Sequence, residues 1–325
     1  MKKILAMLLA VMMLLSVASV AMAEDATHTQ GEADFLKKLT LNGEGAVAPS
    51  VTFSFSAAFD HATDCVAGTT GPALAIGTAT FAADDTATKK VAITHEGAFP
   101  VVGVYYYNVT EADLGVLGIA GETGLVLKVT VTNGDNGALV ENYALYKGEN
   151  KGDTVENTYS AGKLSVTKTV EGALADENKE FNVTVTFTAP EGKSVKSPIT
   201  YVEDGETKTI DLGTDGSWTG SKTVTIALKH NETITFSNIP AGMTYNVEEE
   251  DYTSADKGGY TAADYTFGNA NKTISTTTDT VAIKNAKEGN IDMGVMLDSM
   301  PYVLVLAVVG AAVIALIAKK RRAED

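Results

Sequence analysis

The amino-acid sequence predicts an all-β protein built from two tandem β-sandwich domains. Three observations lead to this fold class: short segments in which apolar and polar residues alternate, Gly-containing turn signals between them, and an internal repeat. No segment between residues 24 and 290 shows a convincing amphipathic helix. Many short strands joined by turns are typical of a sandwich.

Period-two alternation is clearest in three segments, residues 51–55, 125–131 and 183–187. Successive side chains of a strand point to opposite faces, so this pattern indicates half-buried antiparallel strands. Turn signals such as Asn-Gly-Asp at 133–135 and Glu-Gly at 191–192 separate the strands.

Self-similarity divides the chain into two domains. Three features recur in the same order, at offsets of 131, 138 and 128 residues. The matched segments are 35–39 with 166–170, 107–111 with 245–249, and 155–157 with 283–285. We expect one domain over residues 24–160 and a second over 161–289, joined by the short connection Ser160-Ala161-Gly162.

Apolar segments near both ends predict export and a membrane anchor. Residues 1–23 combine two lysines, a short apolar run and an Ala-Met-Ala cleavage site, which favours a secretory signal peptide over a retained membrane helix. Residues 302–318 form a 17-residue apolar stretch, and a basic cytoplasmic tail, 319–325, follows. Everything before the stretch is expected to face outward as an ectodomain tethered at its C-terminus.

Charge excludes nucleic acid as an expected partner. The formal net charge is −16, and residues 24–289 hold 37 acids, 19 lysines and no arginine. Such a surface repels phosphate and lacks the planar fork that binds it bidentately.

The side chains that could act in catalysis or bind a metal are scattered along the sequence. The sequence therefore predicts neither a turnover enzyme nor a cofactor or metal site. Cys65 is the single cysteine, so no intramolecular disulfide is possible. The four histidines show no ligand or triad spacing, and we expect them to be solvated.

Strand parity places one lysine, one glutamate and one asparagine of each domain on a core-facing side. Lys37, for example, shares its face with Phe35, Leu39 and Leu41, because residues i and i+2 point the same way. The six residues are Lys37, Glu111 and Asn157 in the first domain, and Lys168, Glu249 and Asn285 in the second.

This combination of side chains can form a covalent bond. A buried, unpaired lysine tends to lose its proton, and a neutral amine is a nucleophile. An asparagine offers an electrophilic amide carbon, and a protonated glutamate can polarise that carbonyl and shuttle protons. The result would be a Lys–Asn isopeptide bond, which replaces the missing disulfide. In the alternative, a bulge shifts each lysine, or its long side chain reaches the rim and pairs with glutamate there.

At these residues the chain resembles the backbone pilins of Gram-positive bacteria, which sortases assemble from collagen-adhesin B-type immunoglobulin-like domains. The family motifs apolar-x-Lys, Tyr-x-Val-x-Glu and apolar-x-Asn match the six residues in order, twice over. The resemblance implies immunoglobulin-like sandwiches, isopeptide crosslinks from Lys37 to Asn157 and from Lys168 to Asn285, and catalysis of these bonds by Glu111 and Glu249. It also implies a cell-surface location, with a class C sortase and identical subunits as partners.

The sorting region, residues 290–301, departs from the family pattern. In place of a Leu-Pro-x-Thr-Gly-like pentapeptide stands Ile-Asp-Met-Gly-Val, so that a sortase would have to cut between Met293 and Gly294. The resemblance also implies a lysine that accepts the next subunit. Lys151 and Lys147 are the candidates, and an ordinary solvated lysine is the alternative for each.

Two functions remain open from the sequence. One is a structural subunit of a pilus shaft. The other is a wall- or membrane-anchored adhesin whose loops bind a host glycan or matrix protein.

Overall fold

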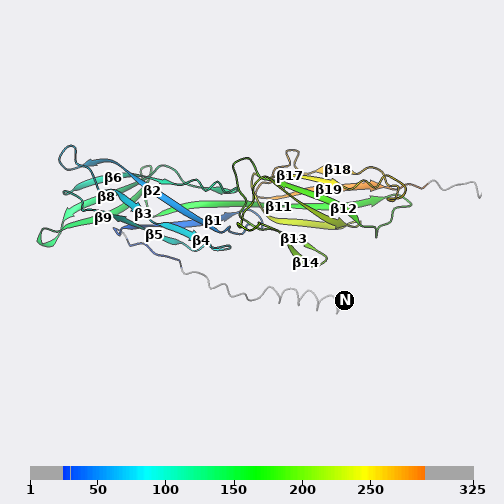
Figure 1. Cartoon of the computed structure of the whole chain (residues 1–325), viewed down its shortest axis with the longest axis horizontal. Helices are drawn as coiled ribbons and strands as arrows, with labels where there is room; N and C mark the ends of the chain where they lie inside the picture. Colours follow the sequence, from blue (N-terminus) through cyan, green and yellow to red (C-terminus); the bar gives the residue numbers. More distant parts are fainter. Residues whose placement is uncertain (1–24, 30, 290–325) are drawn as a thin grey trace, which may run out of the picture.

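The computed structural model describes residues 25–29 and 31–289. These residues form an elongated molecule with two β-rich units end to end along its long axis (Figure 1). The predicted signal peptide, sorting region, membrane helix and basic tail lie outside the described residues. Within the described part of the chain, no helix is long and apolar enough to cross a membrane.

The described residues contain nineteen strands and one short 3₁₀ turn, η1 (Asp135–Gly137). The all-β prediction is therefore confirmed. The strands are β1 (Asp34–Asn42), β2 (Val51–Thr63), β3 (Leu74–Ile76), β4 (Thr78–Phe81), β5 (Lys89–His95), β6 (Gly103–Glu111), β7 (Ile119–Ala120), β8 (Leu125–Asn133), β9 (Leu139–Lys147), β10 (Asn150–Gly152), β11 (Thr154–Glu171), β12 (Phe181–Thr188), β13 (Ile199–Glu203), β14 (Glu206–Ile210), β15 (Ser221–Leu228), β16 (Thr233–Pro240), β17 (Thr244–Glu249), β18 (Asp264–Phe267) and β19 (Thr278–Ala286).

The first unit packs two sheets face to face. One sheet has the order β11-β1-β5-β3, with β7 added beside β11, and the other has the order β10-β9-β8-β6-β2-β4. Alternating apolar residues fill the space between them, and Phe35 of β1 meets Phe55 of β2 edge to face at 5.1 Å between ring centroids.

The second unit repeats this layered design with fewer strands. The order β14-β13-β16-β11-β19-β18 makes one layer, and β15-β12-β17 makes the other. Phe187 of β12 packs against Phe236 of β16 at 5.3 Å between ring centroids. Each unit therefore has its own apolar core.

A single strand, β11, runs through both units. Its first half pairs with β1, and its second half pairs with β16 and β19. The junction lies at residues 160–162, where a short connection was predicted, but these residues form no separate linker: they lie inside a continuous strand, and Ala161 is fully buried. Hydrogen bonds across the junction, such as Val47 N–H to Asn238 Oδ1 at 3.0 Å, join the two units further.

The first and last strands of each unit are parallel and share one register. In the first unit Leu39 stands opposite Asn157, and in the second Val170 stands opposite Asn285. Each asparagine therefore faces the residue two positions after the lysine of its unit. Since i and i+2 share a face, the lysine and asparagine side chains point to the same side of the sheet.

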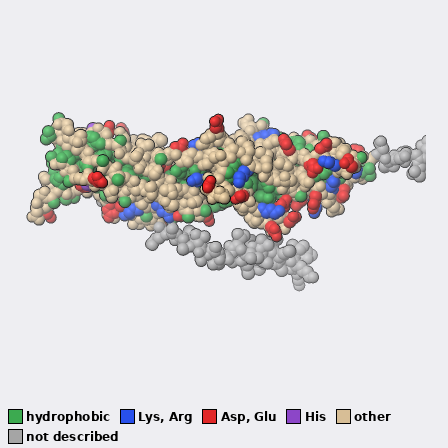
Figure 2. Space-filling model, in the orientation of Figure 1, with side chains coloured by type: hydrophobic (Ala, Val, Ile, Leu, Met, Phe, Trp, Pro, Cys, Tyr) green, Lys and Arg blue, Asp and Glu red, His purple; other side chains and the backbone are tan. Residues whose placement is uncertain are grey.

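Charged side chains are spread over the surface of both units. Figure 2 shows acidic and basic side chains intermixed, more densely over the second unit than at the far end of the first. Two expectations need correction here. Leu41 is 38% exposed, because it is the second-last residue of β1. Three of the four histidines are not solvated: His28 Nδ1 lies 2.6 Å from Asp34 Oδ1, His95 Nε2 lies 3.0 Å from Glu141 Oε2, and His230 accepts a hydrogen bond from Val170 N–H.

Candidate functional site: two buried Lys–Glu–Asn clusters

Lys37 lies in the core of the first unit. It follows the buried Phe35 and precedes the buried Leu39 on the inner face of β1, and its side chain is 0% exposed. The Nζ atom lies 4.5 Å from the centroid of the Phe53 ring, which gives the amine an aromatic neighbour in place of water. Strand parity predicted this burial, and the alternative of a bulge or a rim-seeking side chain is wrong.

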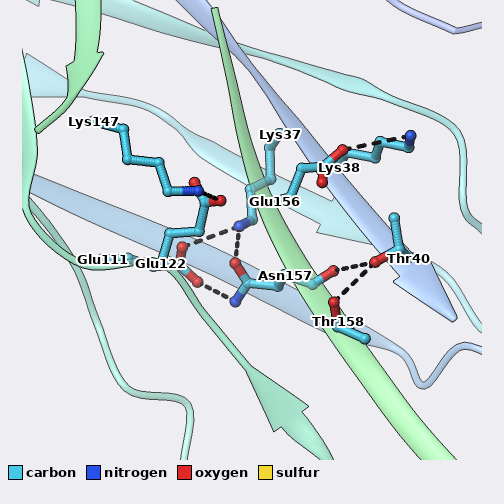
Figure 3. A network of polar contacts seen from close by, with 9 residues as sticks. All are labelled: Lys37, Lys38, Thr40, Glu111, Glu122, Lys147, Glu156, Asn157 and Thr158. Carbon is cyan, nitrogen blue, oxygen red and sulfur yellow. Dashed lines mark hydrogen bonds and ion pairs between the residues drawn. The ribbon is translucent and has the colours of Figure 1, made fainter. Parts of the chain in front are cut away.

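Glu111 and Asn157 converge on Lys37 from two other strands (Figure 3). Lys37 Nζ lies 3.0 Å from Glu111 Oε2 and contacts Asn157 Oδ1 directly. Asn157 Nδ2 donates a 2.6 Å hydrogen bond to Glu111 Oε1. One carboxyl group thus bridges the amine of the lysine and the amide nitrogen of the asparagine.

The second unit assembles the same three residue types. Lys168 of β11 is 0% exposed, contacts Asn285 Oδ1 directly, and lies 3.2 Å from Glu249 Oε2. Its Nζ lies 4.3 Å from the centroid of the Phe181 ring. All six predicted residues are thereby brought together in two clusters of three.

Burial shifts the proton equilibria of these clusters. Desolvation lowers the pKa of Lys37 below its ordinary value, and the nearby Glu111 opposes this change. Desolvation likewise lowers the pKa of Lys168 and raises the pKa of Glu249, each opposed by the other's charge. In the second cluster the two effects together favour a neutral amine beside a neutral carboxyl group, the forms that nucleophilic attack and proton donation require.

The two clusters differ in how the amide nitrogen is held. Asn285 Nδ2 donates to the backbone carbonyl of Thr261 at 3.0 Å and not to the glutamate. Neither Glu249 oxygen receives a hydrogen bond within the described residues, and the side chain is 1% exposed. Burial raises the pKa of Glu249 and favours its protonated form, although the Lys168 amine, 3.2 Å from Oε2, opposes this shift.

Comparison with known proteins finds a matching domain family model for each unit. Residues 34–160 match the family model described as a Spy0128-like isopeptide containing domain, and residues 162–287 match a domain of unknown function, DUF7601. Over 241 residues the chain is 28% identical to a pilin of Streptococcus pyogenes serotype M1, a match that spans 67% of this chain and 68% of that protein. The predicted kinship with Gram-positive pilins is confirmed.

Other similar proteins include further pilus components. The pilus tip adhesin Cpa of Streptococcus pyogenes is 31% identical over 129 residues, which is 39% of this chain and 17% of that adhesin. The crystal structure of the major pilin from Streptococcus pyogenes shares the fold, with a TM-score of 0.54 and 24% identity, and covers 81% of this chain and 100% of that chain. A second major pilin of that species, T3.2, has a TM-score of 0.52 and 21% identity, over 79% of this chain and 98% of that one.

The two lysines predicted as pilin acceptors lie on neighbouring strands of the first unit. Lys147 ends β9, and its Nζ forms an ion pair with Glu122. Lys151 lies on the exposed edge strand β10 and lines a surface hollow of about 410 Å³ beside Tyr143. No ion pair of Lys151 is found among the described residues. Met293 and Gly294, the predicted cleavage site, lie outside the described residues.

Sequence reasoning missed the groups that surround the first cluster. Gly121 and Glu122, just after β7, lie against the first cluster without any motif to mark them. Phe53 lies in a segment predicted to face the core, but nothing in the alternation indicated that Lys37 would lie over its ring, or Lys168 over that of Phe181. Described residues hold no group of three or more side chains arranged to bind a metal ion.

Proposed function

We propose that the chain is a structural subunit of a pilus shaft on a Gram-positive cell surface, with each unit locked by one Lys–Asn isopeptide bond. One observation carries the proposal: two buried Lys–Glu–Asn clusters occupy the same register between parallel first and last strands. A single buried cluster could be an isolated ion pair. Two clusters at equivalent positions of the two units favour the same reaction in both.

The bond-forming step follows from the contacts in the first cluster. Neutral Lys37 Nζ attacks Cγ of Asn157, a new C–N bond forms, and the bond from Cγ to Nδ2 breaks. One proton leaves Nζ for Glu111 Oε2 while Glu111 supplies one to Nδ2 from Oε1, so that ammonia departs and the glutamate is regenerated. Each cluster reacts once, and the chain is not a turnover enzyme.

A crosslink at these positions would stabilise the shaft. The Lys37–Asn157 pair is separated by 120 residues in sequence, so a bond between them constrains a long loop of the unfolded chain. On the entropic account of a disulfide, a loop of that length is worth about 5 kcal/mol. The same residues would hold the first and last strands together under tension.

Assembly would join identical subunits through a class C sortase. Cleavage between Met293 and Gly294 would leave an acyl group on the sortase, and a lysine of the next subunit would accept it. Lys151 fits this role better than Lys147, because Lys147 is already paired with Glu122. Without cleavage, residues 302–318 would remain as a membrane anchor.

A surface adhesin that binds a host glycan or matrix protein is the second candidate. The match to the tip adhesin Cpa favours it, but that match covers 17% of the adhesin. The shaft subunit is the better-supported function, because the match to the M1 pilin covers 68% of that protein.

Intact-protein mass spectrometry of the purified ectodomain tests the proposal. The expected mass is below that of the sequence by two molecules of ammonia, one for each crosslink. A well-folded ectodomain with the mass of the unmodified sequence would overturn the crosslinks in both units.

A further inference from the structure

A small pocket opens beside the reacting amide of the first cluster. Its volume is about 180 Å³, and its lining includes Glu111, Asn157, Gly121 and Glu122. Water needs roughly 10–15 Å³ of comparable space, so there is room for ammonia, a molecule of similar size. The pocket therefore lies next to the side chain that would lose ammonia, and it is large enough to hold that molecule.

The leaving nitrogen of Asn157 lies against this pocket. A Cβ atom placed on Gly121 would lie 2.9 Å from Asn157 Nδ2 and 3.5 Å from Oδ1, so the nitrogen side of the amide faces Gly121. The backbone of Gly121 does not have the positive φ that favours glycine. Glycine suits this position because a side chain would collide with the Asn157 amide, and not because of its backbone conformation.

Glu122 lines the same pocket and has one unsatisfied acceptor. Its Oε1 is held by Lys147, whereas its Oε2 is buried and has no hydrogen-bond partner among the described residues. Figure 3 shows the Lys147–Glu122 pair beside Glu111 and Asn157. A buried carboxylate oxygen without a donor is costly, so a molecule that donates hydrogen bonds is favoured beside it.

We propose that this pocket is the exit for ammonia released from Asn157, and that Glu122 binds the departing molecule through Oε2 while Lys147 holds its carboxylate in place. This inference rests on the proposed isopeptide chemistry. At the pocket ammonia takes a proton from solvent water and becomes ammonium, which a carboxylate favours. Ammonium has no lone pair, so it cannot attack the new bond, and crosslinking becomes irreversible.

The second cluster serves as an internal control. There Asn285 Nδ2 donates to the Thr261 carbonyl, and the amide environment contains neither Gly121 nor Glu122. Changes in the pocket should therefore slow the Lys37–Asn157 bond and leave the Lys168–Asn285 bond unaffected.

Rates can be measured on freshly synthesised ectodomain. Pulse-labelled protein from cell-free synthesis is quenched in acid denaturant at intervals, digested, and analysed by mass spectrometry for the two crosslinked peptides. Gly121→Ala, which pushes on the amide, is compared with Gly152→Ala, where an added Cβ meets nothing within 4 Å. Glu122→Gln, which keeps the shape and removes the charge, is compared with Glu122→Asp, which keeps the carboxylate.

We expect Gly121→Ala and Glu122→Gln to slow the first crosslink on the order of tenfold to a hundredfold, as misplacement of a reacting group does. Gly152→Ala should match the wild type, and Glu122→Asp should recover part of the rate. Wild-type rates in both Gly121→Ala and Glu122→Gln would overturn the exit pocket but leave the crosslinks standing. If Gly121→Ala does not fold, the comparison of Glu122→Gln with Glu122→Asp tests the exit pocket instead. A wild-type protein without crosslinks would overturn both the exit pocket and the isopeptide chemistry.

Discussion

Lys37 and Lys168 show why a charged residue can persist in an apolar core. Each is fully buried, each lies over a phenylalanine ring, and each touches an asparagine and a glutamate. Burial of an unpaired ammonium costs several kcal/mol. Conversion of the lysine into an amide removes that cost permanently, because an amide carries no charge.

At the same scale, the glutamates can be tested separately from the crosslinked residues. Glu111→Ala and Glu249→Ala should each slow one crosslink by about 10²–10⁴-fold, since each removes one proton carrier. Each variant should then gain the mass of one ammonia while it keeps its β-sheet circular dichroism spectrum. Glu156→Ala, at an exposed position next to Asn157, is the matched control. Retention of both crosslinks in either variant would remove that glutamate from the mechanism.

The pH dependence of an uncrosslinked second unit follows from the shifted groups. In Asn285→Ala, Glu249 keeps a pKa raised above its ordinary 4.5, so the folded state binds more protons than the unfolded state and stability falls as pH rises through that window. Lys168 keeps a pKa lowered below its ordinary 10.5, so the folded state binds fewer protons and stability recovers as pH rises toward 10.5. A stability minimum between the two windows is expected.

Urea unfolding across a pH series measures this minimum. The reference is Asn285→Ala combined with Lys168→Met and Glu249→Gln, which lacks both titrating groups. Subtracting its free energy of unfolding at each pH removes the contribution of the other acidic residues. A difference between the two proteins that does not vary with pH would contradict the assigned shifts.

At the scale of elements, parallel pairing of the first and last strands decides where a crosslink can form. Antiparallel neighbours can be joined by a short turn, but parallel neighbours need a long connection. In the first unit the rest of the sandwich supplies that connection, so the proposed bond would close a loop as long as the unit itself. The second unit repeats this arrangement with β11 and β19.

Loss of one crosslink should therefore cost stability through the unfolded chain. Asn157→Ala is expected to lower the free energy of unfolding by about 5 kcal/mol and to increase the rate of proteolysis of the first unit. Guanidinium unfolding and limited trypsin digestion measure the two effects. Asn150→Ala, at an exposed position of β10, should behave as the wild type. Equal stability of both variants would show that the bond adds nothing to the fold.

At the scale of the whole molecule, β11 makes two sandwiches into one elongated body. The strand crosses the junction without interruption, and one sheet includes strands of both units. Gly162 lies within this strand at a crowded point, where an added Cβ would come within 2.3 Å of the Ser275 carbonyl oxygen. Such close backbone packing suits a shaft, in which load must pass from one unit to the next.

Polymer formation is the corresponding test in the producing cell. Lys151→Arg should abolish a ladder of high-mass species on a denaturing gel of cell-wall extract, because arginine keeps the charge but is a poor nucleophile. Lys147→Arg is the matched control and should keep the ladder, since it preserves a cation next to Glu122. A ladder that survives both changes would place the acceptor elsewhere. Absence of a ladder in the wild type would favour the anchored adhesin.

The fold class, the twofold repeat and the six cluster residues could be predicted from the amino-acid sequence alone. Strand periodicity is a local property, so Lys37 and Asn157 could be placed on inner faces from their neighbours alone. The family motifs then indicated which lysine belonged with which asparagine.

Only the tertiary structure decided the features that depend on contacts between distant segments. It merged the predicted connection at 160–162 into β11, placed Leu41 at an exposed strand end, and paired His28 with Asp34. It also brought Gly121 and Glu122 to the Asn157 amide, which no local pattern encodes. These features arise because sheet packing brings together residues far apart in sequence, whereas alternation reports only on which face a residue lies.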